Sequence, residues 1–207
     1  MTGGRFEQAL LQCPVIAIIR ERAAERDLVE VIEALIDGGI RAVEVTVDTP
    51  GWDTLLPKFA GRSGVAVGAG TVRTVAELDR LVAAGGCFAV SPHVDPAIIE
   101  AALARGLTPL PGAMTSTEVN QAMMAGTDYV KLFPAVTVGA AHLRALRGPF
   151  PSLRAIPTGG IGPDDLEAWF EAGAVAAGLG GLLVTGSADE IASRCRRVVA
   201  QFAVRDR

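Results

Sequence analysis

The sequence contains few of the residues that mark disulfide-bonded or metal-binding proteins. Its 207 residues include three cysteines, two histidines and one tyrosine, and aromatic residues make up 5%. Cys13, Cys87 and Cys195 are odd in number, far apart and without a CxxC pair. The sequence therefore predicts neither a disulfide framework nor a zinc site, and we expect three small buried side chains. His93 and His142 are too few for a convincing metal site, so a mechanism without metal or cofactor is predicted.

Long hydrophobic runs and blocks of like charge are also absent. No apolar run approaches the ~18 residues of a membrane-spanning helix, and the N-terminus lacks the basic and apolar regions of a signal peptide. We therefore expect a soluble cytoplasmic protein. The formal net charge is −4 and no Lys/Arg block occurs, which argues against nucleic acid or an anionic membrane as partner.

The composition that remains is typical of a compact α/β protein. Half of the residues are hydrophobic, and 207 residues suffice for one domain with a substantial core. No linker, low-complexity tract or change in composition divides the chain. We predict a single domain over residues 1–207.

Eight short apolar runs alternate with helical patterns along the chain. The runs cover residues 15–20, 42–47, 65–71, 88–92, 108–113, 129–134, 154–161 and 175–184. Capping signals mark helix starts at Thr74 with Glu77, and at Thr115 or Ser116 with Glu118. Strands that are apolar on both faces and alternate with helices predict a parallel sheet covered by helices. Eight such units indicate a closed (β/α)8 barrel, with a doubly wound open sheet as the alternative.

Lys131 interrupts the run 129–134, which otherwise has the pattern of a fully buried strand. Burying an ammonium group without a partner is so costly that the lysine tends to lose its proton. A neutral amine can attack a carbonyl carbon and form a Schiff base. The alternative is structural, with Lys131 facing outward or paired with a buried carboxylate.

Glu44 is a charged residue within the second apolar run, just as Lys131 is within the sixth. The two-residue period of a strand places Glu44, Thr46 and Asp48 on one face, which we expect to point into the barrel. A glutamate buried in the same interior as Lys131 is either its ion-pair partner or an acid/base group for chemistry at that lysine.

Two glycine-rich segments lie at the seventh and eighth strands: Gly159-Gly160-Ile161-Gly162-Pro163 joins the seventh strand to a helix, and Gly178-Leu179-Gly180-Gly181 ends the eighth. Exposed backbone N–H groups at such turns can bind phosphate, and barrels often place a phosphate site there, although tight turns also require glycine. Polar residues at other strand ends are further candidates for ligand binding or for structural roles: Arg20 for an anion, Thr71 and Thr158 as hydroxyl donors or helix caps, and His93 at the pocket wall. His142 is expected at the surface.

Together these segments resemble the bacterial KDPG/KHG aldolase family over nearly the whole chain. The motifs that carry the resemblance are Glu44-Val45-Thr46, Gly68-Ala69-Gly70-Thr71-Val72, Ser91-Pro92, Pro111-Gly112, Val130-Lys131-Leu132-Phe133-Pro134-Ala135 and Thr158-Gly159-Gly160-Ile161. The resemblance implies a trimeric, metal-free class I aldolase with a (β/α)8 fold. Its substrate would be a small 2-keto acid, either 2-keto-3-deoxy-6-phosphogluconate or 4-hydroxy-2-oxoglutarate, cleaved to pyruvate and an aldehyde.

The family mechanism assigns roles to individual residues. Neutral Lys131 would attack the C2 ketone, and Glu44, through a water, would move protons and then take the C4 hydroxyl proton as the C3–C4 bond breaks. Thr71 would help to hold the pyruvyl end. The substrate contacts expected from the resemblance and from position are Arg20, Thr71, Pro92, Thr158, Gly159, Gly160, Gly180 and Gly181.

Two departures from the family pattern bear on the substrate. Asp48 stands where the family commonly has an arginine that binds the substrate carboxylate, so we expect Arg20 to take over that contact. Gly181 stands where the family has a serine in the phosphate turn, which removes a hydroxyl donor. We expect 2-keto-3-deoxy-6-phosphogluconate first and 4-hydroxy-2-oxoglutarate or another 2-keto-3-deoxy acid next. An oxaloacetate decarboxylase and a non-catalytic metabolite-binding barrel remain alternatives.

Overall fold

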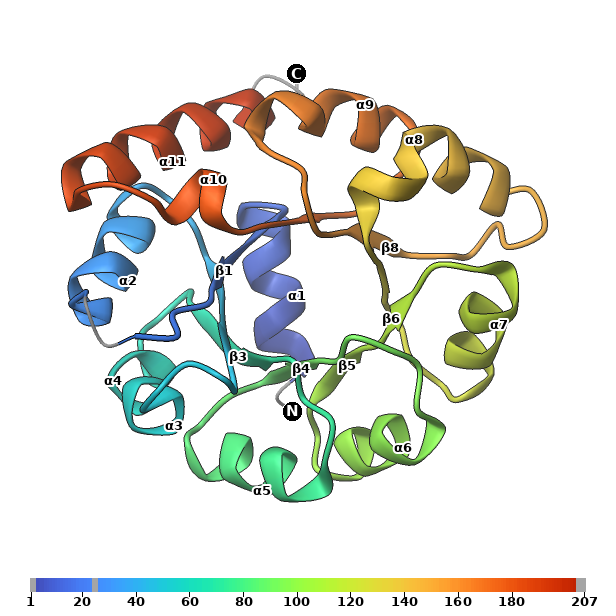
Figure 1. Ribbon diagram of the computed structural model, residues 1–207, viewed down its shortest axis with the longest axis horizontal. Helices are drawn as coiled ribbons and strands as arrows, with labels where there is room; N and C mark the ends of the chain where they lie inside the picture. Colours follow the sequence, from blue (N-terminus) through green and yellow to red (C-terminus); the bar gives the residue numbers. More distant parts are fainter. Residues whose placement is uncertain (1–2, 24–25, 204–207) are drawn as a thin grey trace.

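Strands and helices alternate along the chain in the computed structural model, which describes residues 3–23 and 26–203 (Figure 1). The strands are β1 (Val15–Ile19), β2 (Ala42–Thr46), β3 (Ala66–Gly70), β4 (Phe88–Val90), β5 (Thr108–Leu110), β6 (Gly112–Ala113), β7 (Val130–Leu132), β8 (Ala155–Pro157) and β9 (Ala177–Leu179). The helices are α1 (Gly3–Gln12), α2 (Leu28–Asp37), α3 (Trp52–Leu55), α4 (Pro57–Ala60), α5 (Val75–Ala83), α6 (Pro96–Ala104), α7 (Ser116–Met124), α8 (Ala135–Leu146), the 3-10 turn Pro163–Asp165, α9 (Leu166–Glu171), α10 (Gly181–Val184) and α11 (Ala188–Ala203). None of the described helices combines the length and the apolar character needed to cross a membrane.

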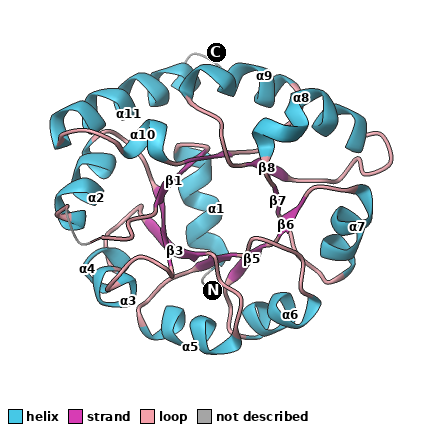
Figure 2. Cartoon of the chain, in the orientation of Figure 1, coloured by secondary structure: helices cyan, strands magenta, loops and turns pink. Residues whose placement is uncertain are grey.

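The strands are parallel and form a curled sheet in two hydrogen-bonded parts. Six strands pair in the order β5-β4-β3-β2-β1-β9, and three in the order β6-β7-β8. A parallel bridge between Thr158 and Gly178 links the end of β8 to β9. Helices surround the outer face of the curled sheet (Figure 2). The α/β class and the parallel sheet predicted from the sequence are thereby confirmed.

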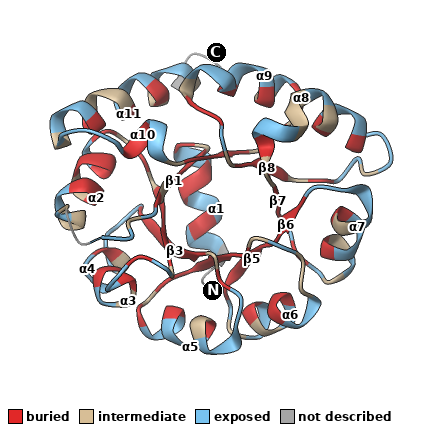
Figure 3. Ribbon diagram, viewed as in Figure 1, coloured by how far each residue is buried: buried red, intermediate tan, exposed pale blue. Residues whose placement is uncertain are grey.

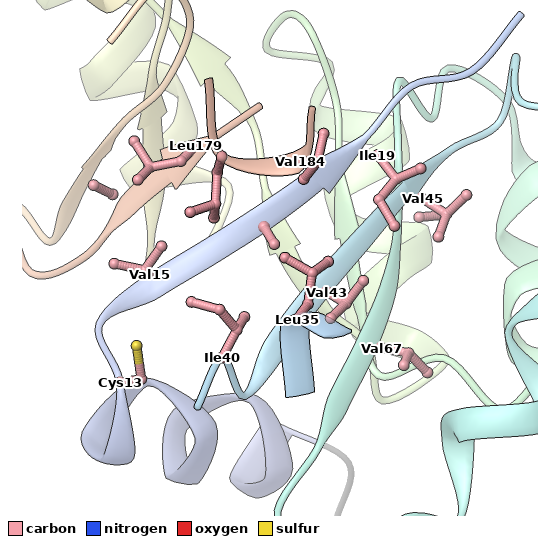
Figure 4. Close-up of a cluster of buried hydrophobic side chains, with 14 of the residues drawn as sticks. Cys13, Val15, Ile19, Leu35, Ile40, Val43, Val45, Val67, Leu179 and Val184 are labelled. Atoms are coloured by element: carbon pink, nitrogen blue, oxygen red, sulfur yellow. The ribbon is translucent and has the colours of Figure 1, made fainter. Parts of the chain in front are cut away.

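Alternate strand residues face outward and pack beneath the helices. In β1 and β2 these residues include Val15, Ile19, Val43 and Val45, which form one cluster with Leu35 of α2 (Figure 4). The strands are buried while the helices expose their outer faces to solvent (Figure 3). A strand whose second face is also enclosed needs apolar residues on both sides, which explains the nearly continuous apolar runs in the sequence.

The inner face of the sheet is closed at one end by α1, which lies across the centre of the curled sheet in the view of Figure 1. Phe6 of α1 is fully buried, and its ring centroid lies 4.5 Å from that of Phe88 and 5.4 Å from that of Tyr129. Ile16 and Ile156 belong to the same inner cluster. Because apolar side chains fill this end, the polar residues of the inner face gather toward the carboxyl ends of the strands.

Several predicted element boundaries are confirmed and others are wrong. Thr74 with Glu77 and Thr115 with Glu118 form capping boxes, so Thr115 rather than Ser116 caps α7. The predicted strands 154–161 and 175–184 extend too far, because β8 ends at Pro157 and β9 ends at Leu179. After β8 the chain has positive φ at Gly159 and Gly160, which no strand can continue through. After β9 it enters the short helix α10.

The three cysteines are buried and unpaired, as predicted. Burial raises the pKa of Cys13 to about 11, of Cys87 to about 11 and of Cys195 to about 12. Thiols with raised pKa values are poor nucleophiles at neutral pH, so these cysteines act as small core residues.

Candidate active site

A pocket of about 550 Å³ opens among the carboxyl ends of β1, β2 and β7 and the turns that follow β8 and β9. This is the end of a parallel sheet at which α/β proteins gather functional residues. The residues predicted from the sequence that line this pocket are Arg20, Glu44, Lys131, Thr158, Gly159, Gly160, Gly180 and Gly181.

Lys131 is the central residue of β7, and its neighbours Val130 and Leu132 belong to the outer cluster beneath the helices. Its side chain therefore points to the inner face, where the residue is 8% exposed and Nζ lies 4.7 Å from the centroid of the Phe133 ring. Burial lowers the pKa of Lys131; the nearby Glu44 raises it, and the charge of Arg20 lowers it further, leaving a net lowering. This environment favours the neutral amine.

Glu44 lies in β2 between Val43 and Val45, which face outward, and it is 2% exposed. Burial raises the pKa of Glu44, while the charges of Lys131 and Arg20 oppose that shift. None of the ion pairs formed by the described residues joins Glu44 to Lys131. Glu44 and Lys131 both line the pocket, so the two groups face the same space without a direct ion pair.

The glycines of Gly68-Ala69-Gly70 make room for side chains on the inner face. A Cβ atom at Gly70 would overlap the carboxylate of Glu44, and one at Gly68 would lie 2.6 Å from the Phe88 ring. Gly70 pairs with Thr46 in β2, two residues beyond Glu44. The glycine-rich motif in β3 thus fixes where the Glu44 carboxylate lies.

Arg20 follows β1 and is held on two sides. Its Nη2 donates a hydrogen bond of 2.6 Å to Oγ1 of Thr71, and its Nε lies 3.7 Å from Oδ1 of Asp48. Thr71 has φ of 63°, an unfavourable conformation for a β-branched residue, and such strain often occurs where a side chain has a functional position. Thr71 does not line the pocket itself; it orients Arg20, which does.

Asp48, predicted from strand period to point into the barrel with Glu44 and Thr46, does not line the pocket. β2 ends at Thr46, so the strand period does not extend to Asp48, which lies in the turn that follows with its side chain 36% exposed. Burial raises the pKa of Asp48, but the hydrogen bond from Thr46 and the charge of Arg20 lower it more. Asp48 is therefore a charged partner of Arg20 at the rim and not a carboxylate inside the pocket. Thr46 is buried on the inner face, as expected.

Backbone conformation and close packing require glycine in the turn after β8 but not in the turn after β9. Gly159 and Gly160 have φ of 96° and 75°, and a Cβ atom there would come within 2.8 Å of the Phe133 ring and 2.5 Å of Val136, respectively. At Gly180 and Gly181, in contrast, a Cβ atom would meet nothing closer than 3.9 Å. The first turn requires glycine, whereas the second leaves open space in the pocket.

Three other candidates lie elsewhere. Pro92 does not line the pocket, and its backbone fills the space beside Gly112, where a Cβ atom would approach within 2.6 Å. His93 is exposed, and its carbonyl accepts a hydrogen bond from Ser91. His142 is partly exposed on α8, with its ring Nε2 2.8 Å from the carbonyl oxygen of Met114, and it does not line the pocket.

Four further pocket residues were not predicted from the sequence: Glu21, Arg26, Leu182 and Thr185. Arg26 directly precedes Asp27, the N-cap of α2, and its Nη2 donates a 3.1 Å hydrogen bond to the carbonyl of Gly186. No signal in the sequence connects these two loops, because the contact spans 160 positions. Within the described residues, no three His, Cys, Asp or Glu side chains gather in a way that could hold a metal ion.

The site brings together the three groups that Schiff-base chemistry on a keto acid needs. Lys131 supplies an amine with lowered pKa, Glu44 supplies a carboxyl group with raised pKa that can accept and return protons, and Arg20 supplies a cation for a carboxylate.

The chain is similar to known aldolases both in sequence and in structure. The family described as "KDPG and KHG aldolase" matches residues 6–197. The 2-dehydro-3-deoxy-6-phosphogalactonate aldolase of Escherichia coli is 35% identical over 170 residues, which cover 81% of this chain and 82% of that protein. A solved structure titled "Native KDPGal structure" superposes with a TM-score of 0.86 at 31% identity, covering 94% of this chain and 97% of that chain.

A second solved structure bears on the chemistry. It is the KDPG aldolase of Legionella pneumophila "with pyruvate captured at low pH as a covalent carbinolamine intermediate". It superposes with a TM-score of 0.83 at 29% identity, covering 96% of this chain and 98% of that chain. A carbinolamine is the adduct that precedes a Schiff base.

Proposed function

Since the chain belongs to the KDPG and KHG aldolase family, whose members are carbon–carbon lyases, we propose that it is a class I aldolase that cleaves 2-keto-3-deoxy-6-phosphogluconate to pyruvate and glyceraldehyde 3-phosphate. The observation that carries this proposal is Lys131, buried on the inner face of β7 in the same pocket as Glu44 but not in an ion pair with it.

In the proposed mechanism the neutral amine of Lys131 attacks C2 of the substrate, and loss of water from the carbinolamine gives a protonated imine. Glu44, with its raised pKa, carries protons in that step and then accepts the proton of the C4 hydroxyl as the C3–C4 bond breaks. The imine takes up the electron pair as an enamine, the aldehyde leaves, and protonation and hydrolysis release pyruvate. Burial of both groups keeps their pKa values suited to these roles.

The two ends of the pocket fit the two ends of this substrate. Arg20, oriented by Thr71 and Asp48, is proposed to bind the carboxylate next to C2. Thr158 lines the pocket between Lys131 and the first glycine turn and is proposed to contact the keto acid. The turns at Gly159-Gly160 and Gly180-Gly181 are proposed to receive the distal phosphate through backbone N–H groups.

The galactonate epimer, 2-keto-3-deoxy-6-phosphogalactonate, is the second candidate substrate. The E. coli relative carries that name, and in this chain an exposed Asp48 stands beside Arg20 where the gluconate pattern has a second arginine. The two substrates differ only in configuration at C4, which is the carbon whose hydroxyl proton Glu44 would accept.

The test is a substrate panel in which pyruvate release is followed with lactate dehydrogenase. The panel contains both phosphorylated epimers, 4-hydroxy-2-oxoglutarate and oxaloacetate. The proposal predicts the highest kcat/KM for the phosphorylated gluconate, loss of all cleavage in Lys131→Met, and no dependence on added metal. Turnover of oxaloacetate alone would show a decarboxylase instead, and pyruvate binding without turnover would show a binding protein.

Closure of the barrel, the oligomeric state and the cellular location are proposed as well. We propose that the two parts of the sheet are one closed (β/α)8 barrel over a single domain of residues 1–207. Two features support closure: β5 and β6 are separated only by Pro111, which cannot donate to the ladder, and the Thr158–Gly178 bridge links β8 to β9. We further propose a cytoplasmic homotrimer, which light scattering of the purified protein would test by its mass.

A further inference from the structure

The cations that line the pocket have separate tasks under the proposed function, on which this inference rests. Among the described residues there are three: Arg20, Arg26 and Lys131. Lys131 is the imine-forming amine, and Arg20 is held by Thr71 and Asp48 at the side of β2 and β3. Arg26 is the one pocket-lining cation without a role in binding the keto acid end.

Arg26 lies at the other side of the pocket. Its hydrogen bond to the carbonyl of Gly186 ties it to the loop that leaves α10, next to Gly181, Leu182 and Thr185, which also line the pocket. One N–H of the guanidinium is used in this bond, and a guanidinium has five. The remaining donors belong to a partly exposed group that lines the pocket and is held by one hydrogen bond.

This side of the pocket otherwise lacks charge that would favour an anion. The turn at Gly180-Gly181 has no side-chain hydroxyl, and the carboxylate of Glu21, which lines the same pocket, would oppose a bound dianion. Leu182 is apolar and 63% exposed. A phosphate held only by backbone N–H groups beside Glu21 would be bound weakly, so a cation is needed there.

We propose that Arg26 determines specificity for a phosphate monoester at the distal end of the substrate. The guanidinium binds the phosphate oxygens from the loop between β1 and α2, and the glycine turns contribute backbone N–H groups. The charge that distinguishes phosphorylated from unphosphorylated substrates therefore comes from a loop outside the motifs shared with the family.

The test compares two substrates that differ only in the phosphate, 2-keto-3-deoxy-6-phosphogluconate and 2-keto-3-deoxygluconate. Hydrogen bonds to charged groups are worth enough that Arg26→Gln should lower kcat/KM for the phosphorylated substrate about 10- to 100-fold. The same variant should change kcat/KM for the unphosphorylated substrate by less than about twofold, because its distal end carries no charge to bind. Arg26→Lys keeps the charge and should restore part of the loss.

The matched control is Arg144→Gln, which removes the same charge from an exposed position of α8. It should leave both substrates unaffected, since it does not line the pocket. An equal loss on both substrates in Arg26→Gln would overturn the inference, because it would mean that Arg26 only supports the loops. An unchanged preference for the phosphorylated substrate would overturn it as well.

A binding measurement separates this inference from the proposed function. Calorimetry with inorganic phosphate should show binding to the wild-type protein and at least about tenfold weaker binding to Arg26→Gln. If the wild-type protein cleaves neither substrate but binds phosphate through Arg26, the proposed function fails and the anion site stands. If the wild-type protein does not bind phosphate, or if the variant binds it equally well, the inference is wrong.

Discussion

Replacing Gly70 with alanine should impair the proposed proton transfer by Glu44, although Glu44 itself is unchanged. A Cβ atom at Gly70 would overlap the Glu44 carboxylate and lie 2.9 Å from its Cγ, so the side chain must move away. Phe88 lies beside the neighbouring Gly68, so the free space into which the Glu44 side chain can move is the pocket that it lines with Lys131. The substitution therefore displaces the proton carrier from Lys131 by about the width of the added methyl group.

The expected magnitude follows from two effects. Displacing a catalytic group by about 1 Å can cost about 100-fold in rate, and a positioned acid/base group contributes about 10²- to 10⁴-fold. We expect kcat for retro-aldol cleavage to fall at least about 100-fold in Gly70→Ala. Overpacking should also lower the free energy of unfolding by about 1–3 kcal/mol. Pyruvate release and urea unfolding measure the two effects separately.

Two further variants test whether Gly70 acts through Glu44. In Glu44→Ala the space beside Gly70 is empty, so adding Gly70→Ala to it should lower neither kcat nor stability further, which is the non-additivity expected of two groups in contact. Gly61→Ala is the control, since its Cβ would meet nothing within 4 Å. Wild-type kcat in Gly70→Ala, or fully additive losses in the double variant, would refute the role of Gly70 in placing Glu44.

The remaining predictions concern pH, strain, the second glycine turn and the core. Pyruvate imine formation should increase as pH rises through the lowered pKa of Lys131. Glu44→Gln should shift the midpoint of this increase to lower pH, because Glu44 raises the pKa of Lys131. Borohydride trapping across a pH series measures both midpoints, and an unchanged midpoint in Glu44→Gln would contradict the coupling of the two groups. Since the pKa of Lys131 is lower in the folded than in the unfolded state, its contribution to stability increases with pH, and Lys131→Met should raise Tm at neutral pH. Thr71→Gly should relieve the strain of a positive φ and stabilise the fold by about 1 kcal/mol, measured by urea unfolding. It should also raise KM in steady-state kinetics, because the hydrogen bond to Arg20 is lost. An unchanged KM would rule out a role of Thr71 in orienting Arg20. Gly181→Ser adds a hydroxyl where space exists and should raise kcat/KM for the phosphorylated substrate about two- to tenfold, whereas no gain would place the phosphate elsewhere. Gly38→Ala should destabilise the fold by about 1–3 kcal/mol in urea with kcat unchanged, because its Cβ would collide with Cys195 far from the pocket.

The sequence allowed the inner-face residues to be predicted where strands are regular. The two-residue period placed Glu44 on the inner face, and the apolar run around Lys131 predicted that this lysine is buried; both residues line the pocket. The same period failed for Asp48, because nothing in Val47-Asp48-Thr49 signals that β2 ends at Thr46. Beyond the strand end, Thr49 shares a side-chain hydrogen bond with Thr46, and Asp48 pairs with Arg20 from the end of β1, a contact that the local sequence does not show.

Contacts between distant loops could not be predicted from one sequence. Arg26 has no motif around it, and its place in the pocket depends on a bond to Gly186, 160 positions away. The packing of Phe6 against Phe88 and Tyr129, by which α1 closes one end of the sheet, likewise has no local signature. The end of β8 was also missed: the predicted strand 154–161 runs through Gly159 and Gly160, whose positive φ values end it.

The role of Lys131 is tested most directly by the mass of the intact protein after treatment with pyruvate and borohydride. We expect one reduced pyruvyl adduct on the wild-type protein and none on Lys131→Met, with the fold of the variant confirmed by its thermal unfolding. No adduct on the wild-type protein, or an adduct that persists in Lys131→Met, would contradict the claim that Lys131 is the imine-forming amine of this aldolase.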